Sequence, residues 1–216
     1  ERVQSVGPFF RNEWNMLDKL DLVMGGRWDW LHYQVKDAFK TDGNQSGSRT
    51  VAQASGSIGL VYHLTEQQQI YTHVASVFEA PTTTELLNNP AGRGGFNPRL
   101  NAQTSLSNEL GIRGNTAGFQ YDTAVFFIRT WDEITPFELP SSPGRAFFRN
   151  AGQSRRLGVE TRLATPEWKG LRGEVSYTYS NFEFEKYVVN DTNLEGKRFP
   201  GIPTHRWEGL VRYAHP

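Results

Sequence analysis

The chain has 216 residues, with 23 basic and 23 acidic side chains and a formal net charge of zero. This balance argues against a dedicated nucleic-acid-binding protein, whose binding face is basic. The absence of cysteine excludes disulfides, thiolate zinc sites and cysteine nucleophiles, and no apolar run reaches the roughly 18 residues that predict a transmembrane helix.

A mean hydropathy of −0.58 is in the range of water-soluble proteins. A β-barrel wall can have the same low value, because only alternate residues of each strand meet lipid. The opening residues Glu1-Arg2-Val3-Gln4 lack the apolar stretch of a signal peptide. We therefore expect the mature form or an internal fragment, and favour the fragment because the chain opens where a loop passes into a strand.

Nine segments in chain order are predicted to be β-strands. They cover residues 5–16, 20–30, 53–64, 69–79, 105–113, 118–131, 156–163, 171–180 and 206–213. The clearest period of two places Leu171 and Val175 on one face of a strand and Arg172 and Glu174 on the other. Most of these strands have ten residues or more. Globular strands usually have about five to six, so this length favours a tilted crossing of a membrane.

Short polar turns and long loops alternate between the strands. The turns lie near Asp18, Glu66, Asn115 and Glu167, about fifty residues apart. The long polar stretches lie near 36–52, 80–103, 132–147 and 185–203. Transmembrane β-barrels have short periplasmic turns and longer extracellular loops. The pattern therefore predicts an all-β fold, the antiparallel up-and-down wall of a transmembrane β-barrel.

Two segments resemble TonB-dependent receptors. Residues 71–86 are similar to the family pattern Y-x-x-x-S-x-x-F-x-A-P-T-x-x-E-L, although Glu79 stands where the family often has arginine. Residues 96–111 are similar to its next element, N-P-x-L-x-x-(E/Q)-x-S-x-x-x-E-x-G. Weaker matches follow the expected order. They are Asn12-Glu13-Trp14 with 20–27, Asn150-Ala151-Gly152 with Gly158-Val159-Glu160, and Pro203-Thr204-His205-Arg206 with 210–213.

The resemblance implies a 22-stranded barrel that is filled by an N-terminal plug. Residues 1–216 would be part of that barrel domain, without the plug and the remaining strands. The implied function is energy-coupled import of a ferric siderophore or a ferric dicitrate-type chelate across the outer membrane of a Gram-negative bacterium. The implied partners are outer-membrane lipid or lipopolysaccharide, the plug, and TonB of the inner-membrane energising complex. No nucleic-acid partner is expected.

Two groups of residues are candidates for function. An anionic chelate needs cationic and aromatic contacts, because arginine offers a fork for carboxylate oxygens and rings cover a chelator. The loop residues predicted for this role are Arg93, Phe96, Arg99, Arg145 and Phe147. Charges on the inner face are predicted to pair across strands or to contact the plug. These are Arg156, Glu160, Arg162, Arg172, Glu174 and Arg212.

No catalytic residues, cofactor or protein-held metal are expected, since iron would arrive wrapped in its chelator. The five histidines lack metal-ligand spacing. The glycine run 92–95 lacks the Lys-Ser/Thr of a phosphate loop. Alternatives remain at this point: import of another large nutrient such as cobalamin or an oligosaccharide, a passive porin, an outer-membrane enzyme barrel, or a soluble β-sandwich binding module.

Overall fold

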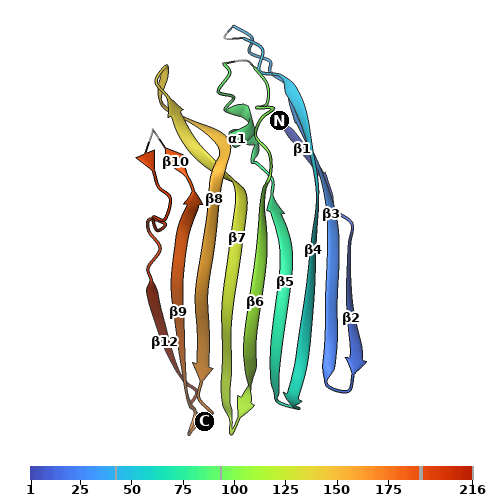
Figure 1. Ribbon diagram of the computed structural model, residues 1–216, viewed down its shortest axis with the longest axis vertical. Coiled ribbons are helices and arrows are strands. Elements are labelled where there is room, and N and C mark those ends of the chain that lie inside the picture. Colours follow the sequence, from blue (N-terminus) through green and yellow to red (C-terminus); the bar gives the residue numbers. More distant parts are fainter. Residues whose placement is uncertain (42, 93, 190–191, 216) are drawn as a thin grey trace.

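The computed structural model describes residues 1–216 except Asp42, Arg93, Asn190, Asp191 and Pro216. Most of the described chain forms one curved antiparallel sheet whose strands follow chain order (Figure 1). Its strands are β1 (Arg2–Val6), β2 (Phe9–Leu17), β3 (Leu20–Val35), β4 (Gly47–Thr65), β5 (Gln68–Glu79), β6 (Gln103–Thr116), β7 (Phe119–Leu139), β8 (Ser142–Ala164), β9 (Leu171–Lys186) and β12 (His205–Tyr213). A short helix, α1 (Thr83–Leu87), and a small hairpin, β10 (Val188–Val189) with β11 (Thr192–Asn193), complete the described elements. No helix in this part of the chain is long and apolar enough to cross a membrane.

The first strand of the sheet is interrupted at Pro8 but keeps its register along β3. Val6 pairs with Trp30 and Phe9 pairs with Arg27, so β1 and β2 follow one line. Proline has no N–H to donate to a β-ladder, and the gap in hydrogen bonding separates the two halves. With β1 and β2 taken together, nine strands cross the sheet in the described chain, as the sequence predicts.

The short turns lie at one end of the sheet, as predicted. At Ala117-Gly118 both residues have positive φ, 52° and 84°, which is the conformation of a two-residue hairpin that matches the twist of its strands. The other turns fall between Leu17 and Leu20, between Thr65 and Gln68, and between Ala164 and Leu171. We call this end of the sheet the turn end and the opposite end the loop end.

The loop predicted over 132–147 is wrong, because this stretch is a β-hairpin. β7 continues to Leu139, which pairs with Ser142 of β8. A β-bulge in β7 at Asp132, with φ of 54°, shifts the register and bends the strand. Beyond the bulge β7 pairs with β8 alone, and a strand with one neighbour tolerates a proline such as Pro136.

The other three loops are shorter or more ordered than predicted. β4 begins at Gly47, so the loop predicted over 36–52 ends before it. The predicted loop over 80–103 contains α1, and the one over 185–203 contains the β10–β11 hairpin. These additions all lie at the loop end (Figure 1).

The two faces of the sheet differ in chemistry. Along one face, apolar side chains in neighbouring strands stay exposed to solvent. They include Trp28, Ile58, Leu60, Tyr62, Val74, Leu106, Leu110, Val125, Leu157, Val175 and Trp207. No second sheet covers this face within the described residues, so the β-sandwich alternative is wrong. An apolar band of this extent on an antiparallel sheet suits contact with lipid.

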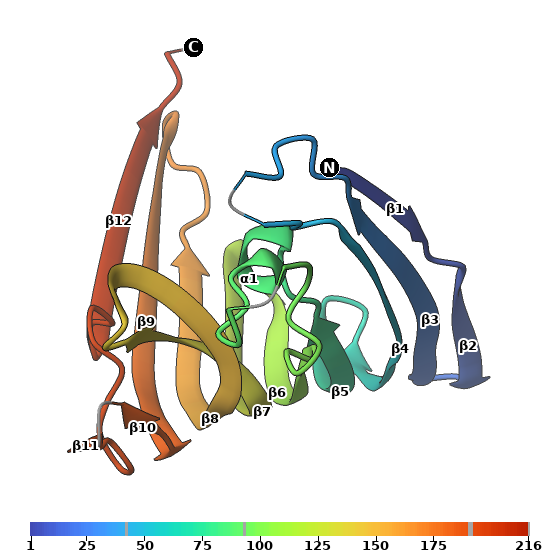
Figure 2. The same ribbon diagram turned by 90° about the horizontal axis from the view of Figure 1, so that it is seen from above.

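Seen from above, the sheet curves around α1 (Figure 2). The apolar band therefore lies on the convex face, because Tyr33, which contacts α1's Leu86, points to the other side of β3 from Trp28. The buried core of the described chain sits on the concave face at the loop end. This position makes the concave loop end the candidate site.

Candidate functional site

The β5–β6 segment, residues 80–102, folds back onto the concave face (Figure 2). A small core joins it to the wall, formed by Tyr33 of β3 with Leu86, Phe96 and Leu100 of the segment, each at most 8% exposed. The rings of Tyr33 and Phe96 meet edge to face with centroids 6.2 Å apart. Burial of this apolar surface holds the segment against the strands.

Helix α1 opens with a capping box that fixes the direction of this segment. Thr82 Oγ1 accepts a hydrogen bond from Glu85 N–H at 3.3 Å, and Glu85 Oε2 accepts one from Thr82 N–H at 2.7 Å. The carbonyl of Pro81 accepts a hydrogen bond from the Tyr33 hydroxyl at 3.0 Å. The A-P-T-x-x-E-L residues thus start the helix and tie it to β3. The Thr-x-x-Glu spacing is the signal from which the sequence could have predicted this helix.

Asn97 is the second anchor and is only 3% exposed. Its N–H donates to the Leu86 carbonyl at 2.6 Å, and its side-chain amide donates to the Phe148 carbonyl at 3.3 Å. Its side-chain oxygen accepts from Arg99 N–H at 3.0 Å, and its carbonyl accepts from the Arg49 guanidinium of β4. Each of these polar groups is therefore satisfied despite burial. Nothing in the sequence reveals these partners, because most are distant in the chain.

A third anchor ties the end of the segment to the bulge in β7. Asn150 of β8 accepts a hydrogen bond from Asn101 N–H at 2.6 Å and donates one back to the Asn101 carbonyl at 2.9 Å. The same amide nitrogen donates to the carbonyl of Asp132 at 2.7 Å. One side chain thus holds both the segment and the bulge, which gives the Asn-Ala-Gly motif a structural role.

The β3–β4 loop touches the segment through glycines. A Cβ on Gly94 would lie 1.7 Å from the carbonyl oxygen of Asn44, and one on Gly47 would lie 3.1 Å from the Cα of Gly95. The glycine run therefore allows two backbones to meet closely. This contact makes the two loops one continuous surface over the concave face.

The predicted ligand residues fall into different surroundings. Phe96 and Phe147 are 8% and 3% exposed, so little of either ring is free to touch a ligand. Arg99 and Arg145 are exposed at the loop end. Arg93 lies outside the described residues. Ligand contact by these five side chains stays a prediction.

Arginine and phenylalanine alternate along the β7–β8 hairpin. The guanidinium of Arg145 lies 5.1 Å from the ring centroid of Phe147, and that of Arg149 lies 5.0 Å from the ring of Phe137. The two rings are 6.0 Å apart. Arg149 and Phe137 are not among the predicted ligand residues, because the bulge at Asp132 and Pro136 hide the hairpin that brings the two together.

The predicted inner-face charges form some of the expected pairs. Arg162 and Glu174, on neighbouring strands, are joined by two hydrogen bonds of 2.6 and 2.7 Å. Arg172 donates to the side chain of Gln120 at 2.6 Å instead of to a carboxylate. Within the described chain neither Glu160 nor Arg212 has an ion-pair partner within 4.0 Å.

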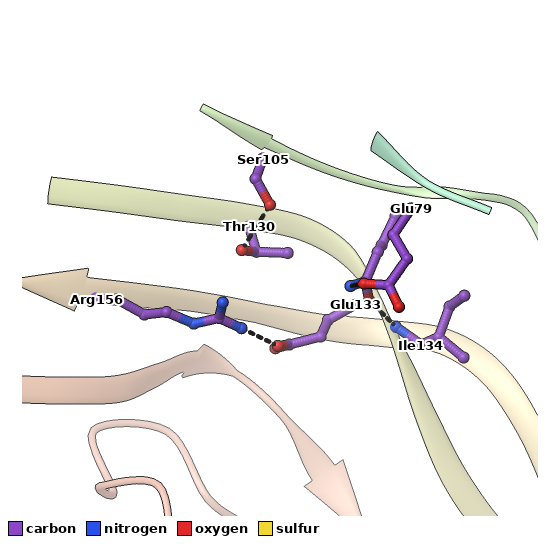
Figure 3. A network of polar contacts seen from close by, with 7 residues as sticks. Glu79, Ser105, Thr130, Glu133, Ile134 and Arg156 are labelled. Atoms are coloured by element: carbon purple, nitrogen blue, oxygen red, sulfur yellow. Dashed lines mark hydrogen bonds and ion pairs between the residues drawn. The ribbon is translucent and has the colours of Figure 1, made fainter. Parts of the chain in front are cut away.

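Arg156 belongs to a polar network that braces the bulge (Figure 3). Its guanidinium donates to Glu133 Oε1 at 2.9 Å. Beside this pair, the side chain of Gln103 donates to Glu79 at 2.7 Å and accepts from the N–H of Ile134 at 2.9 Å. Glu79, the departure from the family pattern, therefore orients the glutamine that holds β7 as it leaves the sheet.

The described part of the chain holds no cluster of three or more His, Asp or Glu side chains suited to a metal ion. The arrangement that it does hold is a charged, braced concave wall beneath two interlocked loops. Such a wall can bind and orient a large polar solute.

Comparison with known proteins places the whole chain in one family. The family model described as "TonB dependent receptor-like, beta-barrel" matches residues 1–216. The pesticin receptor of Yersinia pestis is 26% identical over 197 residues, which cover 89% of this chain and 28% of that receptor. The chain thus spans less than a third of the length of this curated relative.

Solved structures agree with this fold. The ferric yersiniabactin uptake receptor FyuA from Yersinia pestis superposes with a TM-score of 0.71 at 21% identity, covering 97% of this chain and 31% of that one. The copper transporter OprC superposes with a TM-score of 0.76 at 14% identity, covering 99% of this chain and 34% of that one. Similarity at these identities describes the fold and not the ligand.

Proposed function

Because this chain belongs to the TonB-dependent receptor β-barrel family, which consists of receptors and not enzymes, we propose that it acts in energy-coupled import of a ferric siderophore or a ferric dicitrate-type chelate. The observation that carries the proposal is the contrast between the two faces of one continuous sheet. The convex face exposes apolar side chains over the middle of the strands, whereas the concave face carries paired charges and the inward-folded segment 80–102. A wall of this kind separates lipid from a polar interior.

The proposed location is the outer membrane of a Gram-negative bacterium, with the turn end in the periplasm and the loop end outside. Lipid and lipopolysaccharide would contact the convex face. An N-terminal plug would fill the interior, and TonB would reach the receptor through that plug. In this arrangement the interlocked loops meet the solute first, and the paired charges of the concave face lie further along its path.

The proposed cargo is an anionic chelate of several hundred daltons. Arg99 and Arg145 are exposed at the loop end, and neither forms an ion pair with a described residue. Arg49 is also held there by carbonyl and amide oxygens and not by a carboxylate. Guanidinium groups without carboxylate partners favour an anionic solute. The ferric yersiniabactin uptake receptor supports an iron chelate as the cargo, and the copper transporter is the reason to test other metals.

Growth tests the proposal directly. A strain from which the gene is deleted should fail to grow on the cognate ferric chelate as its only iron source. Growth should return with the intact gene, and it should not return in a strain that lacks TonB. Equal growth of the deletion strain on every ferric chelate offered, or dependence on copper or cobalamin in place of iron, would overturn the iron proposal.

Membrane insertion is tested separately. The intact receptor should require detergent for extraction and should migrate differently on a gel before and after heating, because a folded β-barrel resists the detergent of the gel. A folded monomer in plain buffer would contradict the membrane location whatever the growth assay gives.

A further inference from the structure

A small cavity lies beside the β7–β8 hairpin, apart from the core around Leu86. Its volume is about 360 Å³, and its lining includes Phe137, Arg149, Lys186 and Tyr187. The first two belong to the hairpin, and the other two lie where β9 ends. The cavity is therefore formed between two separate parts of the loop end, neither of which could bind a solute in this way alone.

The cations of this cavity have no carboxylate partner. Among the described residues, no ion pair includes Arg149 or Lys186. One nitrogen of Arg149 donates to the Val188 carbonyl at 2.8 Å, and its guanidinium lies 5.0 Å from the ring of Phe137. These neutral contacts orient the guanidinium and leave its charge uncompensated. Among the described residues of the lining Glu138 is the one carboxylate, so these residues together carry a net positive charge.

The aromatic rings that line the cavity, those of Phe137 and Tyr187, are held in place by contacts with neighbouring rings. Phe137 packs against Phe147, which is buried. Tyr187 packs against Phe184 with ring centroids 4.7 Å apart, and Phe184 in turn packs against Phe199 at 4.3 Å. Two braced rings offer flat apolar walls for another ring. Because little has to be ordered on binding, this site is preorganised.

We propose that this cavity binds an aromatic carboxylate, with the carboxylate on Arg149 and Lys186 and the ring between Phe137 and Tyr187. A simple inorganic anion would use the cations but not the apolar walls, and a neutral ring would leave the cations unused. A cavity of this size suits a single substituted ring more than a whole chelate. The inference rests on the proposed function in one respect, since the carboxylate would be an end group of the imported chelate.

A fluorinated probe tests the site without iron. The intact receptor is placed in lipid nanodiscs, and binding of 4-(trifluoromethyl)benzoate is followed by the width of its fluorine resonance. We expect broadening with the unaltered receptor and a roughly tenfold weaker affinity in Arg149→Gln and Lys186→Gln, because each change removes a charge-assisted contact. The matched control is Lys36→Gln, which removes an exposed lysine elsewhere at the loop end. Each variant is first checked for folding by its heat-dependent migration.

The neutral analogue 4-(trifluoromethyl)benzyl alcohol should cause little broadening, and inorganic phosphate should compete poorly. No broadening by the benzoate, or equal broadening in all variants, would overturn the site. Uptake of radioactive iron by the same variants separates the two proposals. Benzoate binding that depends on Arg149, in a receptor that takes up no ferric chelate, would leave the site standing and contradict the iron proposal. Chelate uptake by a receptor that does not bind benzoate would support the iron proposal and overturn the site.

Discussion

The ring of Tyr71 on β5 lies over Gly111 on β6, its direct partner in the sheet. A Cβ on Gly111 would meet the Tyr71 ring at 2.4 Å, and Gly111 is buried beneath that ring. An aromatic side chain that covers a glycine in the neighbouring strand protects the bare backbone and fixes register. The two residues also begin and end the two family-like segments, 71–86 and 96–111. The family pattern in these two segments therefore includes two residues that are in contact across neighbouring strands.

This contact predicts the effect of filling the glycine. We expect Gly111→Ala to lower the free energy of unfolding of the intact receptor by about 1–3 kcal/mol, because the added methyl group displaces the ring. Tyr71→Leu in the same protein should recover part of the loss, as a double-mutant cycle of denaturation midpoints would measure. Gly209→Ala is the control, since apart from its chain neighbours no described residue has an atom within 4 Å of a Cβ there. Additive losses from the two changes would contradict the contact.

The wall could be predicted from the sequence because its causes are local. Alternation along the strand 171–180 sets which side chains face lipid, and turn residues near Ala117 and Gly118 set where strands reverse. Each of these signals depends on residues that are close together in the chain. Strand order and the two faces of the sheet can therefore be predicted without knowledge of distant contacts.

The concave site could not be predicted to the same degree, because its anchors join distant residues. Asn97 depends on Arg49 and Phe148, some fifty residues away on either side. Phe96 looks like an exposed loop aromatic in the sequence and is buried by Tyr33. The hairpin over 132–147 was hidden for another reason. Its bulge and its proline interrupt the alternation that the strand would otherwise show.

A prediction follows for Asn150, which both donates to and accepts from Asn101. In Asn150→Asp the donor becomes an oxygen that faces the carbonyls of Asn101 and Asp132, so repulsion replaces two hydrogen bonds. We expect segment 80–102 to detach, with protease cleavage of the intact receptor at least tenfold faster there. Asn150→Ala should have a smaller effect, because it loses the bonds without adding repulsion.

The matched control for this change is Asn193→Asp. Asn193 accepts a hydrogen bond from Glu195 N–H through Oδ1 at 3.0 Å, which an aspartate can also accept. Cleavage in the control should equal that of the unaltered receptor. Equal cleavage of Asn150→Asp and Asn150→Ala would contradict the repulsion expected between the new oxygen and the two carbonyls.

Gly94 should control the contact between the two loops. In Gly94→Ala the new methyl group would lie 1.7 Å from the Asn44 carbonyl, so the β3–β4 loop has to move away. We expect a longer and broader distance distribution between spin labels at Phe39 and Ala91, both of which are exposed. The chain has no cysteine of its own, so cysteines introduced at these positions can be labelled selectively within it. An unchanged distribution would mean that the loops do not meet through this glycine.

Acid should loosen the β3–β4 loop through Asp37. Hydrogen bonds from the N–H groups of Gln45 and Phe39, each 2.9 Å long, hold the pKa of Asp37 below its usual value. A lowered pKa in the folded state contributes stability above the unfolded value of about 3.9, and this contribution is lost as the pH falls through the folded-state pKa. We therefore expect a label at Phe39 to become more mobile as the pH is lowered from 5 to 3. In Asp37→Asn the side chain has no charge to lose, so the label should be mobile at pH 5 already and change little on acidification. A response to acid that persists in Asp37→Asn would assign the effect to another group.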